Sequence, residues 1–141
     1  MYCLLGGGRQ HFQRSAETNI DPLESISVDL IPDFKAKGYT FVRNKTELTQ
    51  KAIAPRILGL FSDSHMPYAI DPKYGTDFSE VPDLATLFNA ALDRLSASKR
   101  GFVLQVETGR VDHAGHVNDP AAILYEFLEF DRCIPIAIGV S

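Results

Sequence analysis

One short segment, residues 107–116, gathers side chains that bind divalent metals. Glu107 ends an apolar run, and Asp112, His113 and His116 follow within nine residues. A carboxylate oxygen suits Mg²⁺, and a carboxylate combined with an imidazole suits Zn²⁺. Because Asp112 and His116 are four residues apart, one helical turn would place both on the same side. The pattern predicts that these two residues share one ion, that Glu107 serves a neighbouring ion, and that His113 lines the same pocket.

The same residue types also fit a solvated polar loop, because loops are exposed and polar by default. Three ligands do not complete even one zinc site, so other segments would have to contribute. The position of Glu107 at the end of an apolar run favours the metal site, since sites in α/β proteins gather beyond the carboxyl ends of strands. Residue types alone leave both interpretations open.

Composition bounds the remaining possibilities. The chain has 141 residues, 45% of them apolar and 23% charged, which is typical of one soluble globular domain. A net charge of −4 gives no reason to expect nucleic acid as a partner. No apolar stretch reaches the ~20 residues that span a bilayer, and the amino terminus does not resemble a signal peptide. Cys3 and Cys133 are expected to be free thiols.

Short apolar runs alternate with helical periodicity, which predicts an α/β fold with a mainly parallel sheet. Strands are expected at 4–5, 39–42, 57–61 and 102–106, and helices at 30–37, 44–48, 84–98 and from 119 to about 128. Asp29, Asn44, Asp83 and either Asn118 or Asp119 are the expected helix caps. Asp63 and His65 follow strand 57–61, so they are expected at the same rim as Glu107.

Other candidate sites are weaker. The glycines at 6–8 with Arg9 would suit a phosphate, but the P-loop Lys-Ser/Thr is missing, so a tight turn is favoured. His11 and His65 are interpreted as loop or packing residues. Neither serine of the loop at 62–67 lies in a nucleophile elbow, and no HExxH zinc motif occurs.

Residues 101–118, GFVLQVETGRVDHAGHVN, strongly resemble the metal-site segment of alkaline phosphatases. Three earlier segments resemble the same family in the expected order. They are LLGGGRQHF at 4–12, KAKGYTFVR at 35–43 and LGLFSDSHMPY at 58–68. The resemblance covers nearly the whole chain. It implies a three-layer α/β/α fold, incomplete here, in which residues 1–141 are one partial domain.

The resemblance also implies an activity and a set of ligands. Alkaline phosphatases hydrolyse phosphate monoesters with two Zn²⁺ and one Mg²⁺, and paired metals stabilise the attacking and leaving oxygens of such a displacement. By motif, Glu107 matches the Mg²⁺ ligand, and Asp112 and His116 match ligands of the zinc that activates the hydrolytic water. His113 matches a position near the phosphate. A homodimer and a periplasmic or extracellular location are also implied.

Some family features are missing from these 141 residues. The Asp-Ser-Ala/Ser motif of the serine nucleophile does not occur, and the phosphate-gripping arginine and the remaining zinc ligands are expected outside the matched region. Thr108 stands where relatives often have Gly or Ala. The end of the chain is apolar, which suggests an interrupted sequence. Two hypotheses follow: a central portion of an alkaline phosphatase, or an inactive remnant that binds metal or a partner.

Overall fold

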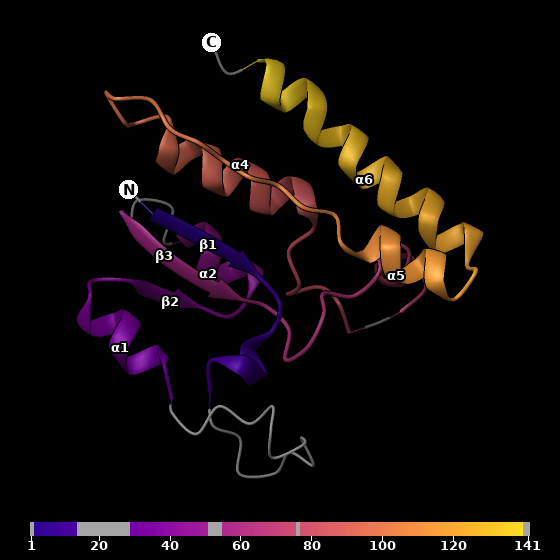
Figure 1. Cartoon of the computed structure of the whole chain (residues 1–141), viewed down its shortest axis with the longest axis horizontal. Helices are drawn as coiled ribbons and strands as arrows, with labels where there is room; N and C mark the ends of the chain where they lie inside the picture. The colour runs from indigo at the N-terminus through magenta and orange to yellow at the C-terminus, as the bar shows by residue number, and fades with distance from the viewer. Residues whose placement is uncertain (1, 14–28, 51–54, 76, 140–141) are drawn as a thin grey trace.

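Three parallel strands form the sheet of the part of the chain that the structure describes (Figure 1). The structure is a computed structural model and describes residues 2–13, 29–50, 55–75 and 77–139. The strands are β1 (Tyr2–Gly6), β2 (Thr40–Val42) and β3 (Arg56–Leu60), in the order β1-β3-β2. Both pairings are parallel, with Leu4 and Phe41 each aligned with Leu58. The expected parallel sheet is therefore confirmed.

The helices of the described residues are η1 (Arg9–His11), α1 (Ile31–Ala36), α2 (Lys45–Gln50), α3 (Asp71–Tyr74), α4 (Leu84–Leu95), α5 (Arg110–His116) and α6 (Pro120–Ile138). Three of them, α2, α4 and α6, begin directly after an expected capping residue, whereas the N-cap of α1 is Leu30 and not Asp29. The caps Asp83 and Asp119 accept hydrogen bonds from backbone amides three residues on, and Asn44 does the same for Glu47. Each bond satisfies an amide that the first helical turn leaves without a partner.

Strand β3 is buried on both faces, which gives the fold its layers. Leu58 and Leu60 pack with Ile31 of α1 on one face of the sheet. On the other face, Ile57 packs with Leu48 of α2 and with apolar residues of α4. Because successive strand residues point to opposite faces, the nearly continuous apolar run of β3 fills both cores. The arrangement is the incomplete three-layer α/β/α fold that the sequence predicts.

The strand expected at 102–106 is not formed in the structure. This segment pairs with none of the described strands and runs extended along α4 (Figure 1). Leu104 and Val106 pack against α4 and α6, beside Phe88 and Cys133, while Val103 is 95% exposed. The expectation that both faces of this segment are covered is wrong, because Phe102 and Val103 are exposed, and a strand also requires a ladder partner. Contacts with the two helices partly bury Leu104 and Val106 without such a partner.

Helix α6 extends well beyond the expected helix and includes Pro135 near its end. Its inner face packs on α4 through Cys133, and Figure 1 shows the two helices side by side. Both cysteines are free, as the sequence predicts. None of the helices in the described residues is sufficiently long and apolar to cross a bilayer.

Candidate functional site

Two loops at the carboxyl ends of neighbouring strands are joined by backbone hydrogen bonds. The glycine turn after β1 donates from Gly8 N to Ser64 O over 2.6 Å, and Arg9 N donates to Ser62 O over 3.0 Å. The Arg9 guanidinium also forms an ion pair of 2.6 Å with Asp63. The glycines form a tight turn, as predicted. The Gly8 amide is bonded to Ser64 O, so it is not available to bind a phosphate. The loop that carries His65 is thereby fixed to β1.

Gly7 allows this close approach. An added Cβ would lie 2.3 Å from Ser64 O, so only glycine fits between the two loops without a shift of the backbone. Gly8 contributes differently, because its φ of 79° is a left-handed conformation that favours glycine. The two glycines thus serve the turn for different physical reasons.

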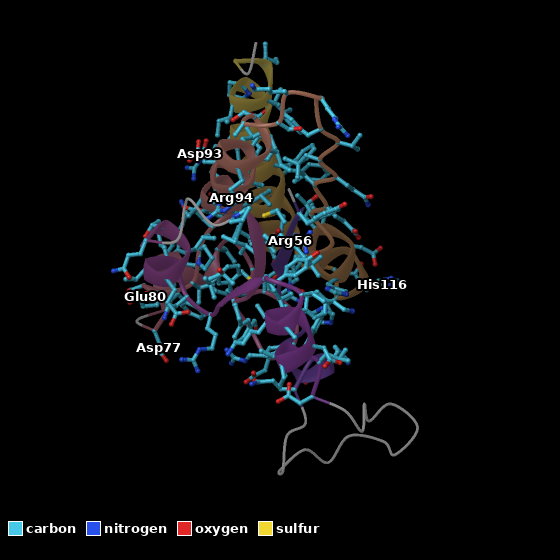
Figure 2. All side chains as sticks on the ribbon, turned by 90° about the vertical axis from the view of Figure 1, so that its left-hand side faces the viewer. Arg56, Asp77, Glu80, Asp93, Arg94 and His116 are labelled. Atoms are coloured by element: carbon cyan, nitrogen blue, oxygen red, sulfur yellow. The ribbon has the colours of Figure 1, made fainter. Side chains whose placement is uncertain are left out.

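Helix α5 brings Asp112 and His116 together. His116 Nε2 lies 3.4 Å from Asp112 Oδ2, as expected for residues four apart on a helix. Both side chains are about three quarters exposed, and Figure 2 shows His116 at the periphery of the molecule. The pair therefore faces solvent.

His113 lies on another side of α5 and meets the loop after β3. Its ring centroid is 4.3 Å from that of His65, with the planes tilted by 57°. Arg110 Nη1 lies 3.3 Å from His113 Nδ1. The structure therefore brings His65 and His113 to one rim, with His65 packing against a neighbouring ring as predicted.

Glu107 shares a cavity with His113 but not with Asp112 or His116. This cavity has a volume of about 1090 Å³ and is also lined by the glycine turn, His65 and Glu126. In the described residues, no three His, Cys, Asp or Glu side chains gather closely enough to hold one ion. The structure thus divides the predicted cluster into a cavity group and a solvent-facing pair.

The sequence does not predict three interacting residues of this cavity, Tyr68, Arg110 and Glu126. Tyr68 offers its ring to the Arg110 guanidinium, whose central carbon lies 3.6 Å from the ring centroid. Glu126 of α6 accepts a hydrogen bond of 2.7 Å from Ala69 N. The spacing of Arg110 and His113, three residues apart, was a usable signal for their contact. Nothing in the sequence indicates that Tyr68 and Glu126 line the same cavity as Arg110 and His113, because each comes from a distant segment.

Comparisons with known proteins agree with the resemblance. The sequence profile of the family described as alkaline phosphatase matches residues 1–141. The chain belongs to the alkaline phosphatase family. Alkaline phosphatase 3 of Bacillus subtilis is 32% identical over 98% of this chain. Streptomycin-6-phosphate phosphatase of Streptomyces griseus is 34% identical over 96% of it.

Solved alkaline phosphatases share the fold of this chain. The enzyme from Thermus thermophilus is 41% identical with a TM-score of 0.81, covering 96% of this chain and 26% of that one. The enzyme from a Shewanella species is 32% identical with a TM-score of 0.74, covering 95% of this chain and 28% of that one. This chain covers 26% of the Bacillus protein and 34% of the Streptomyces protein. It therefore spans about a quarter to a third of these relatives.

The pair on α5 fits a zinc ion by its chemistry and its spacing. Ligand atoms about 2.0–2.2 Å from one tetrahedral ion lie roughly 3.3–3.5 Å apart. The 3.4 Å between Asp112 Oδ2 and His116 Nε2 falls within this range. A carboxylate oxygen and an imidazole nitrogen are also donors that zinc accepts.

Glu126 is the buried carboxyl group of the cavity. Burial raises its pKa above the ordinary value, while the hydrogen bond from Ala69 N and the charge of Arg110 partly oppose that rise. The folded chain therefore holds this proton more tightly than the unfolded chain does. By linkage, the contribution of Glu126 to stability is greatest below the unfolded pKa of about 4.3 and declines as the pH rises through the raised folded pKa.

Two substitutions of Glu126 distinguish the effect of its ionisation from the effect of its hydrogen bond with Ala69 N. We expect Glu126→Gln to keep the acceptor for Ala69 N and to remove the decline in unfolding free energy from about pH 4.3 upward. Glu126→Ala should lose the acceptor and cost about 1–3 kcal/mol. Urea unfolding of the three proteins at several pH values measures both effects. Parallel pH profiles for wild type and Glu126→Gln would contradict the expectation.

Proposed function

We propose that residues 1–141 are part of one alkaline phosphatase domain that hydrolyses phosphate monoesters with two Zn²⁺ and one Mg²⁺. Glu107 would bind Mg²⁺, and Asp112 and His116 would be two ligands of one zinc ion. The observation that carries the proposal is the 3.4 Å pair on α5, in a chain of this family. When bound, such metals stabilise negative charge on the oxygens of a phosphoryl group.

The residues of the chain have distinct parts in this proposal. Helix α5 sets the spacing of the zinc ligands, because its backbone fixes residues four apart on one side. His113 lines the cavity next to Glu107, where an imidazole N–H is a suitable donor for a phosphate oxygen. The glycine turn and the Arg9–Asp63 ion pair hold the loop that supports the His113 ring.

Two relatives supply context for the substrate and the metal. The name of the Streptomyces griseus protein states a phosphate monoester, streptomycin 6-phosphate, as its substrate. A structure of a variant alkaline phosphatase from the Antarctic bacterium TAB5 has Mg bound in its M3 site. The proposed substrate class for this chain is accordingly phosphate monoesters.

A second candidate function is a remnant of the same fold that binds metal or a partner without catalysis. In this candidate the fold keeps its metal-binding or partner-binding part without the Asp-Ser-Ala/Ser motif, which residues 1–141 do not contain. The flanking coding sequence distinguishes the two. An Asp-Ser-Ala/Ser motif upstream and an Asp-His motif downstream in the same reading frame would support the phosphatase. Stop codons directly on both sides would support the remnant.

The 141-residue polypeptide by itself is expected to be inactive. With the nucleophile motif missing and two zinc ligands present on α5, it should hydrolyse p-nitrophenyl phosphate no faster than buffer containing Zn²⁺ and Mg²⁺. The measurement is the release of p-nitrophenol by purified protein. A turnover that Glu107→Ala abolishes would show the expectation to be wrong.

A further inference from the structure

Arg110 lies in a chain of contacts that connects α6 with His113. Its guanidinium packs over the ring of Tyr68 at 3.6 Å and reaches His113 Nδ1 with Nη1 at 3.3 Å. The His113 ring also lies against the ring of His65. A guanidinium over an aromatic face is attracted by the ring quadrupole and loses orientational freedom there. The direction of the Arg110 donor is therefore set by the ring beneath it.

The Tyr68 ring is itself held by its backbone. Tyr68 N donates to Asp71 Oδ2 over 2.8 Å, and the next amide, Ala69 N, donates to Glu126 Oε1 over 2.7 Å. Two hydrogen bonds from adjacent backbone amides to side-chain oxygens fix the direction of this segment. One of them comes from α6, so that helix α6 helps to position the cavity side of α5.

The contact between Arg110 and His113 decides which ring nitrogen carries the proton. A guanidinium has five N–H donors and no acceptor, so Nδ1 of His113 must accept the bond. A neutral imidazole has one acceptor and one donor nitrogen, which leaves the hydrogen on Nε2. A fully ionised phosphate oxygen only accepts hydrogen bonds. His113 thus has a donor available for an anion when its ring is neutral.

We propose that Arg110 is a positioning residue that fixes the ring of His113, with Nδ1 as acceptor and Nε2 as donor for a phosphate oxygen. Tyr68 serves as the platform of the guanidinium. The proposal rests on the proposed phosphatase function for the identity of the anion. The orientation of the His113 ring and the position of its proton are inferred from the contacts of Arg110 alone.

The proton position can be read by NMR of the 141-residue chain labelled with ¹⁵N. Long-range ¹H–¹⁵N spectra above about pH 8, where an ordinary imidazole is neutral, distinguish the two tautomers. Wild type should show His113 with its proton on Nε2 and a nuclear Overhauser contact with the ring of His65. Arg110→Met should shift the two ring nitrogens of His113 toward a mixture of tautomers and weaken that contact. Arg110→Lys, which keeps a charged donor, should restore part of both signals.

A matched control tests whether the effect belongs to this site. Arg132 lies on α6, pairs with Glu129 and is exposed, so Arg132→Met should leave the His113 spectrum unchanged. If Arg110→Met does not fold, Tyr68→Leu, which removes only the platform, carries the same expectation. A proton on Nδ1 in wild type, or unchanged His113 signals in the folded variants, would overturn the proposal. The readout does not involve hydrolysis, so a failure of the proposed function would leave the ring geometry and the proton position of His113 intact and remove only the phosphate as the anion.

Discussion

Gly7→Ala is expected to destabilise the fold and to separate the two loops that support the His113 ring. The new Cβ would lie 2.3 Å from Ser64 O and 3.1 Å from Met66 N. Both atoms belong to the backbone, so no side-chain rotation relieves the contact, and one loop must move. Forced overpacking of this kind costs about 1–3 kcal/mol, occasionally more. Urea unfolding measures the loss, and the amide signals of Ser64 and His65 report the displacement.

The neighbouring glycine provides the control. A Cβ added at Gly6 meets nothing within 4 Å, although Gly6 precedes Gly7 directly in the chain. Gly6→Ala is therefore expected to change the unfolding free energy by no more than about 0.5 kcal/mol. Equal effects of the two substitutions would mean that the close approach to Ser64 is not what requires glycine at position 7.

Leu58→Ala is expected to cost about 2–5 kcal/mol of unfolding free energy, the range for large-to-small substitutions in a core. Leu58 is 0% exposed in the central strand and packs with Ile31 and Leu60 against α1. Removing three carbons leaves a cavity that the strand, paired on both sides, can collapse only in part. For a domain of this size such a loss is a large share of the total stability. Chemical denaturation followed by circular dichroism measures it.

The register of the sheet provides a matched leucine. Leu4 of β1 is aligned directly with Leu58 of β3, yet it is 49% exposed. Leu4→Ala removes the same atoms from the adjacent strand, where about half of them already face solvent. Its cost should be clearly smaller than that of Leu58→Ala. A similar cost at both positions would contradict the assignment of β3 as the centre of the packed layers.

Much of the local structure follows from short patterns in the sequence. Asp83 caps α4, and Asp119 with Pro120 begins α6, because a side-chain oxygen followed by helical periodicity meets a local need of the backbone. The pairing of Asp112 with His116 is similar, since residues four apart on a helix are neighbours in any fold. The assignment of Glu107, Asp112 and His116 as metal ligands stays a prediction.

Segment 102–106 owes its conformation to contacts with distant parts of the chain. Its apolar residues predict burial, and Leu104 and Val106 are in contact with the helical core. Whether buried apolar residues form a strand depends on a hydrogen-bonding partner from elsewhere in the chain. In the described residues β1 pairs with β3 and not with this segment. The composition of five residues contains no information about that partner.

The sequence by itself determined the capped helices and the chemical types gathered at 107–116, because these depend on neighbours within a few residues, and its ordered motifs indicated the family. Only the tertiary structure decided that Glu107 and His113 share a cavity while Asp112 and His116 face solvent. It also decided that Arg110 lies between Tyr68 and His113. The contact of Tyr68 with Arg110 joins segments distant in the sequence, and it forms only when packing of the layers brings the two segments together.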